Sequence, residues 1–273
     1  MIAAWGAAAA VLASLLLGAL GLAVGSFLNV VIHRVPAGRS VVRPSSSCPV
    51  CGTVITARDN IPVVSWLLLR GRCRQCGTSI SARYPLIEAA TGLLWVLLGW
   101  WAVGTDHVWL LPWLLVLASA GIALTAIDLE YHRLPNAIVY PLYPLLLAGL
   151  ALAAVGETSV PWLDALIGAA VWLVVIGGIW LIGGGRGMGF GDVKLAPILG
   201  ATLGWLSIGT SVVGLLVAFL AGAVVGIILM LQGRAGRRTA LPFGPFLFVG
   251  VLVALVIGTR LSDLYLGLAL GAG

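Results

Sequence analysis

Long apolar segments constrain this chain more than any other feature of its sequence. Residues 162–182 and 193–228 carry almost no charge and are long enough to lie in the hydrocarbon of a bilayer. Over the whole chain, 61% of residues are hydrophobic and 9% are charged, whereas an ordinary soluble domain carries about 25% charged residues. The sequence therefore predicts an all-α polytopic membrane protein.

The hydropathy pattern predicts about eight membrane-spanning helices. The first segment has no basic region before it and is too long for the apolar core of a signal peptide, so we expect a retained span. The sixth segment is shorter than the about 20 residues that a full crossing needs, so we expect it to be tilted, broken or partly re-entrant. The predicted spans are residues 2–30, 86–103, 108–127, 137–155, 162–182, 193–205, 208–231 and 242–258.

The distribution of basic residues predicts the orientation. With the N-terminus outside, only Arg260 falls on the outer side, where the loops hold Asp106, Glu157 and Asp263. This asymmetry is the positive-inside pattern, so the net charge of +6 indicates cytoplasmic loops and no nucleic-acid partner. The basic residues expected on the cytoplasmic side are Arg34, Arg39, Arg43, Arg58, Arg70, Arg72, Arg74, Arg83, Arg133, Arg186, Lys194, Arg234, Arg237 and Arg238.

All four cysteines lie in the one sizeable polar segment, residues 33–84. Cys48 and Cys51 form one C-x-x-C-G pair, and Cys73 and Cys76 form the other, with 21 residues between the pairs. Four thiolates on two tight turns can close a tetrahedral structural zinc site. Two disulfides or four free thiols are the alternatives, and a reducing cytosol disfavours disulfides. We expect a zinc-binding loop whose metal supplies folding free energy, because so short a segment has little core.

Two aspartates lie beside apolar spans on the same predicted side of the membrane. Asp192 is part of Gly-Met-Gly-Phe-Gly-Asp-Val-Lys-Leu, residues 187–195, and Asp128 ends the third predicted span. A carboxylate at the bilayer centre costs about 2.5–3.5 kcal/mol on insertion scales, so an acidic residue near a span is a functional candidate. The glycines before Asp192 permit close approach of an extended substrate, or they form a plain flexible loop.

Paired carboxylates are the strongest catalytic set in the sequence. One carboxylate can take a proton from water while the other donates a proton to a carbonyl oxygen, and proximity separates their pKa values. Glu130 is two residues from Asp128 and shares no helix face with it, so we expect it to be solvated. The sequence contains no H-E-x-x-H and no phosphate-binding glycine motif. The three histidines all fall at span ends: His33, His107 and His132.

Taken in order, these motifs make the whole chain resemble the type IV prepilin peptidases, relatives of the GxGD intramembrane aspartyl proteases. The motifs that carry the resemblance are residues 25–34 (Gly-Ser-Phe-Leu-Asn-Val-Val-Ile-His-Arg), the two C-x-x-C pairs, residues 83–88 (Arg-Tyr-Pro-Leu-Ile-Glu), Asp128 with the His-Arg-Leu-Pro-Asn that follows, residues 187–195, and residues 241–246 (Leu-Pro-Phe-Gly-Pro-Phe).

The resemblance implies a bifunctional enzyme of the bacterial cytoplasmic membrane. Asp128 and Asp192 would be the catalytic pair that cuts a basic leader from type IV prepilins or pseudopilins. The enzyme would then methylate the new N-terminus with S-adenosylmethionine. The implied organisation is a first span at residues 1–32, a zinc loop at 33–84 within a methyltransferase-associated region 1–107, and a peptidase domain at 108–273. Glu88 either belongs to the methyltransferase or is a helix N-terminal carboxylate.

Two other classes of function remain open from the residues alone. A membrane scaffold with a partner-binding zinc loop predicts that the two aspartates lie far apart as structural caps. A proton-coupled transporter predicts that both carboxylates lie near the midplane of the membrane. The two aspartates lie on the same predicted side of the membrane, and a glycine-rich stretch precedes one of them. This combination favours the peptidase.

Overall fold

A computed structural model describes residues 6–185, 188–234 and 241–270 of the 273-residue chain. Four residues that the sequence placed in cytoplasmic loops or in the glycine motif therefore lie outside the described residues: Arg186, Gly187, Arg237 and Arg238.

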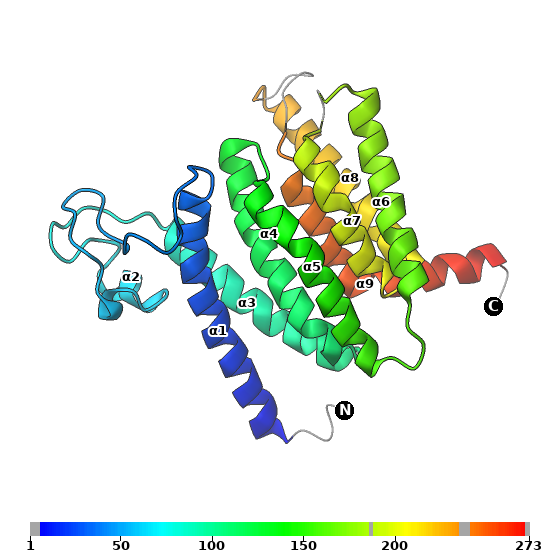
Figure 1. The fold of residues 1–273 in the computed structure, drawn as a ribbon, viewed down its shortest axis with the longest axis horizontal. Helices are drawn as coiled ribbons and strands as arrows, with labels where there is room; N and C mark the ends of the chain where they lie inside the picture. Colours follow the sequence, from blue (N-terminus) through cyan, green and yellow to red (C-terminus); the bar gives the residue numbers. More distant parts are fainter. Residues whose placement is uncertain (1–5, 186–187, 235–240, 271–273) are drawn as a thin grey trace. The chain divides into compact units, whose positions relative to one another are not determined.

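The described residues form α-helices and short 3-10 turns without a named β-strand, which confirms the all-α prediction (Figure 1). The α-helices are α1 (Ala7–Arg34), α2 (Val64–Leu68), α3 (Arg83–Gly104), α4 (Leu111–Tyr131), α5 (Asn136–Ala153), α6 (Trp162–Ile182), α7 (Phe190–Gly204), α8 (Ile208–Leu231) and α9 (Gly244–Leu270). The 3-10 turns are η2 (Ala57–Asp59), η3 (Val108–Leu110) and η4 (Ala154–Gly156).

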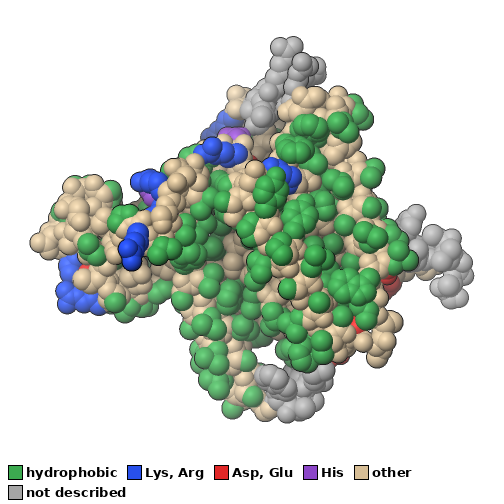
Figure 2. All heavy atoms as spheres, viewed as in Figure 1, with side chains coloured by type: hydrophobic (Ala, Val, Ile, Leu, Met, Phe, Trp, Pro, Cys, Tyr) green, Lys and Arg blue, Asp and Glu red, His purple; other side chains and the backbone are tan. Residues whose placement is uncertain are grey.

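Seven of the described helices are long and apolar enough to cross a membrane. Hydrophobic side chains cover much of the surface in view, as expected for a protein that faces lipid (Figure 2). The predicted total of eight spans is not confirmed, because α7 has only 15 residues. Most residues of α7 are buried, so this helix is shielded by protein and does not need the length of a lipid-exposed span.

The chain divides into two compact units, Met1–Ala123 and Leu124–Gly273, with the division inside α4. In the first unit α1 packs on α3 through small residues. A β-carbon on Gly21 would lie 2.8 Å from the Cα of Gly92, and one on Gly25 would lie 2.7 Å from the Cα of Glu88. Only glycine permits this approach of two helix backbones.

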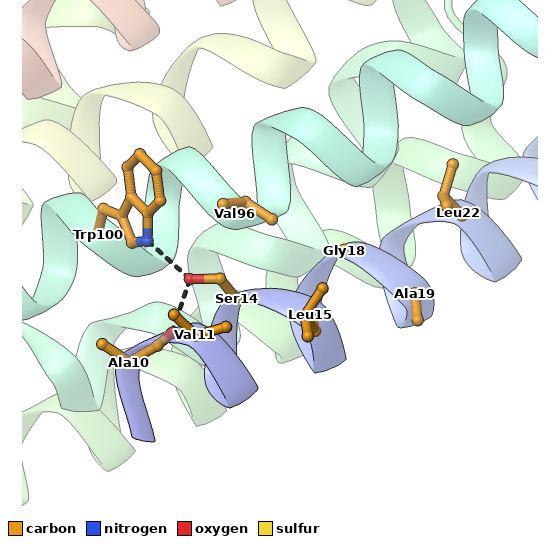
Figure 3. Close-up of a pocket in the computed structure, with 9 residues that line it drawn as sticks. All are labelled: Ala10, Val11, Ser14, Leu15, Gly18, Ala19, Leu22, Val96 and Trp100. Atoms are coloured by element: carbon orange, nitrogen blue, oxygen red, sulfur yellow. Dashed lines mark hydrogen bonds between the residues drawn. The ribbon is translucent and has the colours of Figure 1, made fainter. Parts of the chain in front are cut away.

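A shallow apolar groove lies between the first half of α1 and the second half of α3 (Figure 3). Leu15 and Val96 are among the apolar residues that line it, and the Trp100 indole N–H donates to Ser14 Oγ at 2.8 Å. No titratable side chain lines the groove, so it offers no catalytic group.

In the second unit α7 is the central helix and contacts α5, α6, α8 and α9. Glycine again allows the closest approach: a β-carbon on Gly200 of α7 would lie 2.3 Å from the carbonyl oxygen of Gly168 in α6. The buried Trp172 of α6 donates its indole N–H to the carbonyl of Ser211 in α8 at 3.0 Å. This packing holds α7 against α6, and α6 against α8, within the second unit.

Candidate active site and metal centre

Asp128 lies in the last turn of α4 and is 5% exposed. The helix ends there because His132 has φ +52°, a left-handed conformation, with its N–H bonded to the Asp128 carbonyl at 2.9 Å. The Asp128 carboxylate accepts a buried hydrogen bond at 3.0 Å from the N–H of Gly244, the first residue of α9. A first-turn N–H has no partner within its own helix, so this carboxylate also gains from the positive end of the α9 dipole.

Asp192 lies in the first turn of α7 and is also 5% exposed. Its Oδ2 accepts the N–H of Gly189, the N-cap residue, at 3.1 Å. The other carboxylate oxygen, Oδ1, is buried and has no hydrogen-bond partner among the described residues. Each aspartate thus uses one oxygen to bind a glycine N–H at a helix start, and the buried Oδ1 of Asp192 is available for a proton or a substrate.

Asp128 and Asp192 lie near the same residue of the second unit, and their charges interact. Leu134, which follows α4, touches the start of both helices: a β-carbon on Gly191 would lie 2.8 Å from Leu134 Cβ, and one on Gly244 would lie 3.3 Å from Leu134 Cδ2. Asp192 lies at the start of α7, before its apolar residues. Helix α7 is not one of the seven helices that are long and apolar enough to cross a membrane. Burial, with a smaller contribution from the negative charge of Asp128, raises the pKa of Asp192 to about 7.

A second set of residues fixes α7 against α5. The Lys194 ammonium group binds Asn136 Oδ1 at the start of α5 and lies 5.4 Å from the centre of the Tyr140 ring. The Tyr143 hydroxyl donates to the Lys194 carbonyl at 2.7 Å. Pro197 cannot donate an N–H to the Val193 carbonyl and weakens the helix locally, and the Tyr143 hydrogen bond to the neighbouring Lys194 carbonyl attaches this part of α7 to α5.

The amino-acid sequence does not reveal the roles of Gly244, Leu134 and Lys194. The proline-containing motif of residues 241–246 contains Gly244, so it indicated the right segment of the chain. Nothing local to that motif shows that a main-chain N–H at residue 244 binds Asp128, because the two residues are far apart in the chain.

The four predicted cysteines form one cluster in the first unit. The Sγ atoms of Cys48, Cys51, Cys73 and Cys76 all lie within 4.8 Å of one another, and the Cys48 and Cys76 sulfurs are 3.8 Å apart. Four ligands at the usual Zn–S distance of about 2.3 Å lie about 3.8 Å from each other in a tetrahedron. The cluster therefore has the donors and the size of a structural metal site.

Two equivalent turns present these thiols. Gly52 (φ +72°) and Gly77 (φ +70°) donate their N–H groups to the carbonyls of Cys48 and Cys73 at 2.9 and 3.0 Å. A side chain would strain this left-handed conformation, which explains the glycine after each pair. Hydrogen bonding to Thr53 lowers the pKa of Cys51 to about 6, whereas burial and the neighbouring thiols raise the pKa of Cys76 to about 11.

Glu88 is buried in α3 and accepts the N–H of Val63 at 2.6 Å. It therefore connects the cysteine-containing loop to α3. Asn29 of α1 donates to the Tyr84 carbonyl at 3.2 Å, near the start of the same helix.

The fold and these sites define a class: a multi-pass α-helical membrane protein with a buried aspartate pair and a tetracysteine loop. Two family models match the chain, the bacterial peptidase A24 N-terminal domain over residues 19–102 and the type IV leader peptidase family over residues 115–231. The chain belongs to the type IV leader peptidase family.

Curated relatives support the same family. The chain is 39% identical to a prepilin leader peptidase/N-methyltransferase of Aeromonas salmonicida, over 90% of this chain and 91% of the relative. A protein of the same name from Pseudomonas aeruginosa is 35% identical over 92% of each chain. One from Myxococcus xanthus is 46% identical over 81% of this chain and 64% of the relative. No solved structure is significantly similar to the chain.

Proposed function

We propose that this protein removes the leader peptide of type IV prepilins or pseudopilins and then N-methylates the new N-terminus. The observation that carries the peptidase is the buried pair Asp128 and Asp192, each held through one oxygen by a glycine N–H. Neither a scaffold nor a transporter is favoured, because the aspartates interact and lie at helix ends, and because the relatives are named peptidases.

Asp128 and Asp192 divide the proton transfers of amide hydrolysis between them. Asp192 is the acid, because burial favours its protonated form near neutral pH. Ionised Asp128 takes a proton from a water molecule, whose oxygen attacks the scissile carbonyl carbon, while Asp192 donates its proton to the carbonyl oxygen. As the gem-diol intermediate collapses, Asp128 gives the proton it took from water to the leaving nitrogen, the C–N bond breaks, and Asp192 regains a proton from a gem-diol hydroxyl, which restores both starting states.

The orientation in the membrane follows from the charge pattern. The N-terminus lies outside, and the basic loops, the cysteine loop and both aspartates lie on the cytoplasmic side of the bacterial inner membrane. The excess of arginine in the loops assigned to that side supports this orientation.

The test is cleavage in a defined membrane. The purified full chain in liposomes is incubated with a prepilin that carries its leader, with and without S-adenosylmethionine. We expect leader removal in both samples and addition of one methyl group only with the methyl donor, measured by mass spectrometry. An intact prepilin after prolonged incubation would contradict the peptidase, and cleavage without methylation would contradict only the second activity.

Cleavage should fall as the pH rises through about 7, because Asp192 then loses the proton that it must donate. The same raised pKa favours the folded state most below the ordinary value of 3.8, and this contribution to stability is lost as the pH rises through about 7. The rate of leader removal at substrate saturation is measured from about pH 6 to about pH 9. A rate that stays constant over this range would contradict the role of Asp192 as the acid.

We infer that the cysteine cluster holds zinc as a structural ion. Four thiolates leave no coordination position for substrate in a tetrahedral site, so the ion would stabilise the loop without taking part in hydrolysis. The spacing of the sulfurs and the paired turns support this assignment.

Cys51→Ser should remove the metal and unfold the loop while the aspartate-containing unit stays folded. A loop with so little core depends on the metal for its folding free energy. Elemental analysis should find about one zinc per wild-type chain and much less in the variant. Trypsin should cut the variant faster at the arginines between residues 34 and 83. Ser45→Ala, at an exposed residue of the same loop that is not a ligand, serves as the control, and metal-free wild-type protein would contradict the assignment.

We propose that residues 1–107 contain the methyltransferase-associated region, with the first span at 1–32 and the cysteine loop at 33–84, and that residues 108–273 form the peptidase domain. The two family matches support this organisation, since they lie on either side of residues 103–114. S-adenosylmethionine is the methyl donor implied by the name of the relatives.

A further inference from the structure

The α2 segment of the cysteine loop has an inverted arrangement of polar and apolar side chains. Four apolar residues point outward: Ile61, Val64, Leu67 and Leu68 are 49%, 47%, 61% and 76% exposed. Ser65, the polar residue among them, is buried at 6%. A water-exposed helix normally has the opposite arrangement. We call the four outward side chains the α2 apolar face.

Specific hydrogen bonds hold the inward side of the segment. Ser65 Oγ donates to the Arg58 carbonyl at 2.9 Å and accepts the N–H of Ile61 at 3.0 Å. The Trp66 indole N–H donates to the Ile80 carbonyl at 3.0 Å. These bonds select one orientation of α2, so the exposure of the apolar face is a built feature of the loop.

A strained turn precedes the α2 apolar face. Val63 has φ +62° and ψ −49°, and the Val64 N–H bonds to the Pro62 carbonyl at 2.6 Å, which is a γ-turn with positive φ. A β-branched residue rarely adopts this conformation. The Val63 N–H points to the buried carboxylate of Glu88, at 2.6 Å. The strain persists because this charge-assisted hydrogen bond attaches the turn to α3.

This attachment places the α2 apolar face beside the bilayer. Glu88 lies within the candidate span Arg83–Gly104, near the end where that helix begins. Exposed arginines flank the face, Arg58 before it and Arg70 and Arg72 after it. Lys and Arg side chains gather over the loop and the adjoining end of α1 (Figure 2). An apolar face bordered by arginines at the edge of a transmembrane helix matches the chemistry of a lipid surface with anionic headgroups.

We propose that the α2 apolar face inserts into the membrane interface and anchors the cysteine loop there, with the Glu88–Val63 hydrogen bond as its tether. Leu67 and Leu68 contact acyl chains, and the flanking arginines contact anionic headgroups. The partner is the bilayer in which the chain is embedded. The proposal does not depend on peptidase activity.

Depth-dependent quenching tests this anchor. A small fluorescent non-canonical amino acid replaces Leu68 in the full chain, in nanodiscs that contain phosphatidylglycerol. The matched control carries it at Val42, an exposed apolar residue of the same loop outside the α2 face. We expect quenching by nitroxide-labelled lipid to be at least about threefold stronger at position 68 than at position 42, and iodide quenching to show the reverse order.

Three further measurements make the outcome decisive. Thermal unfolding checks each labelled protein, and a label at Leu67 gives an independent reading if position 68 does not tolerate one. Glu88→Ala should reduce lipid quenching at position 68, whereas Glu88→Gln, which keeps an acceptor oxygen, should retain it. Equal iodide access at positions 68 and 42 would overturn the proposal. Protection of position 68 from both quenchers would also overturn it, since it would indicate a protein partner or a second copy.

Discussion

Asp128→Asn and Asp192→Asn should each abolish leader cleavage, with a loss of at least about 10³-fold, equivalent to about 4 kcal/mol of transition-state stabilisation. An amide cannot exchange the proton that either step requires. Asparagine keeps an oxygen that can accept the N–H of Gly244 or Gly189, and it removes the repulsion between two buried carboxylates. Both variants should therefore insert into the membrane and fold.

The measurement is leader removal from a prepilin in liposomes, together with expression level and thermal unfolding. Glu130→Gln is the matched control, because Glu130 is an exposed acid two residues from Asp128. We expect it to retain near wild-type cleavage. Full cleavage by either aspartate variant would refute the assignment of the pair.

Gly244→Ala should reduce cleavage by about 10²-fold although it adds only a methyl group. The new β-carbon would lie 2.9 Å from Asp128 Oδ2 and 3.3 Å from Leu134 Cδ2. The carboxylate or the start of α9 must then move, which lengthens the hydrogen bond that fixes Asp128. Gly244 acts through Asp128, so it is a positioning residue.

A merely structural effect of Gly244→Ala can be distinguished from a positioning effect. Gly178→Ala in α6 is the control, since a β-carbon there meets no atom within 4 Å. We expect kcat for leader removal to fall in Gly244→Ala with little change in KM, and the pH profile to shift, because a displaced carboxylate changes the interaction between the pair. Equal kcat values in the two variants would contradict the role of Gly244.

Local sequence patterns anticipated much of the fold and the composition of the sites. Apolar length predicted most of the spans, because lipid requires a long run of apolar side chains wherever a helix is exposed to it. The sixth predicted segment is the exception. It corresponds to α7, whose contacts are mainly with other helices, and hydropathy alone cannot tell a short buried helix from a short span.

The cysteine cluster was predictable because each C-x-x-C-G turn is local and two such turns in one loop have few other uses. Counting spans predicted that Asp128 and Asp192 lie on the same side of the membrane, which permits their approach but does not require it. The identity of the groups that hold them was not predictable, because the donors are main-chain N–H groups that any residue except proline carries.

The sequence by itself therefore determined that this protein is a multi-pass helical membrane protein with four thiols in one loop and two acids beside apolar segments. Only the tertiary structure decided that the starts of α7 and α9 meet the end of α4 at Leu134, that glycine N–H groups bind both carboxylates, and that α2 exposes its leucines. The physical reason is the separation along the chain over which each interaction acts. Hydropathy and turn chemistry act between neighbours in the chain, whereas these contacts join distant segments whose approach depends on how closely the helices pack.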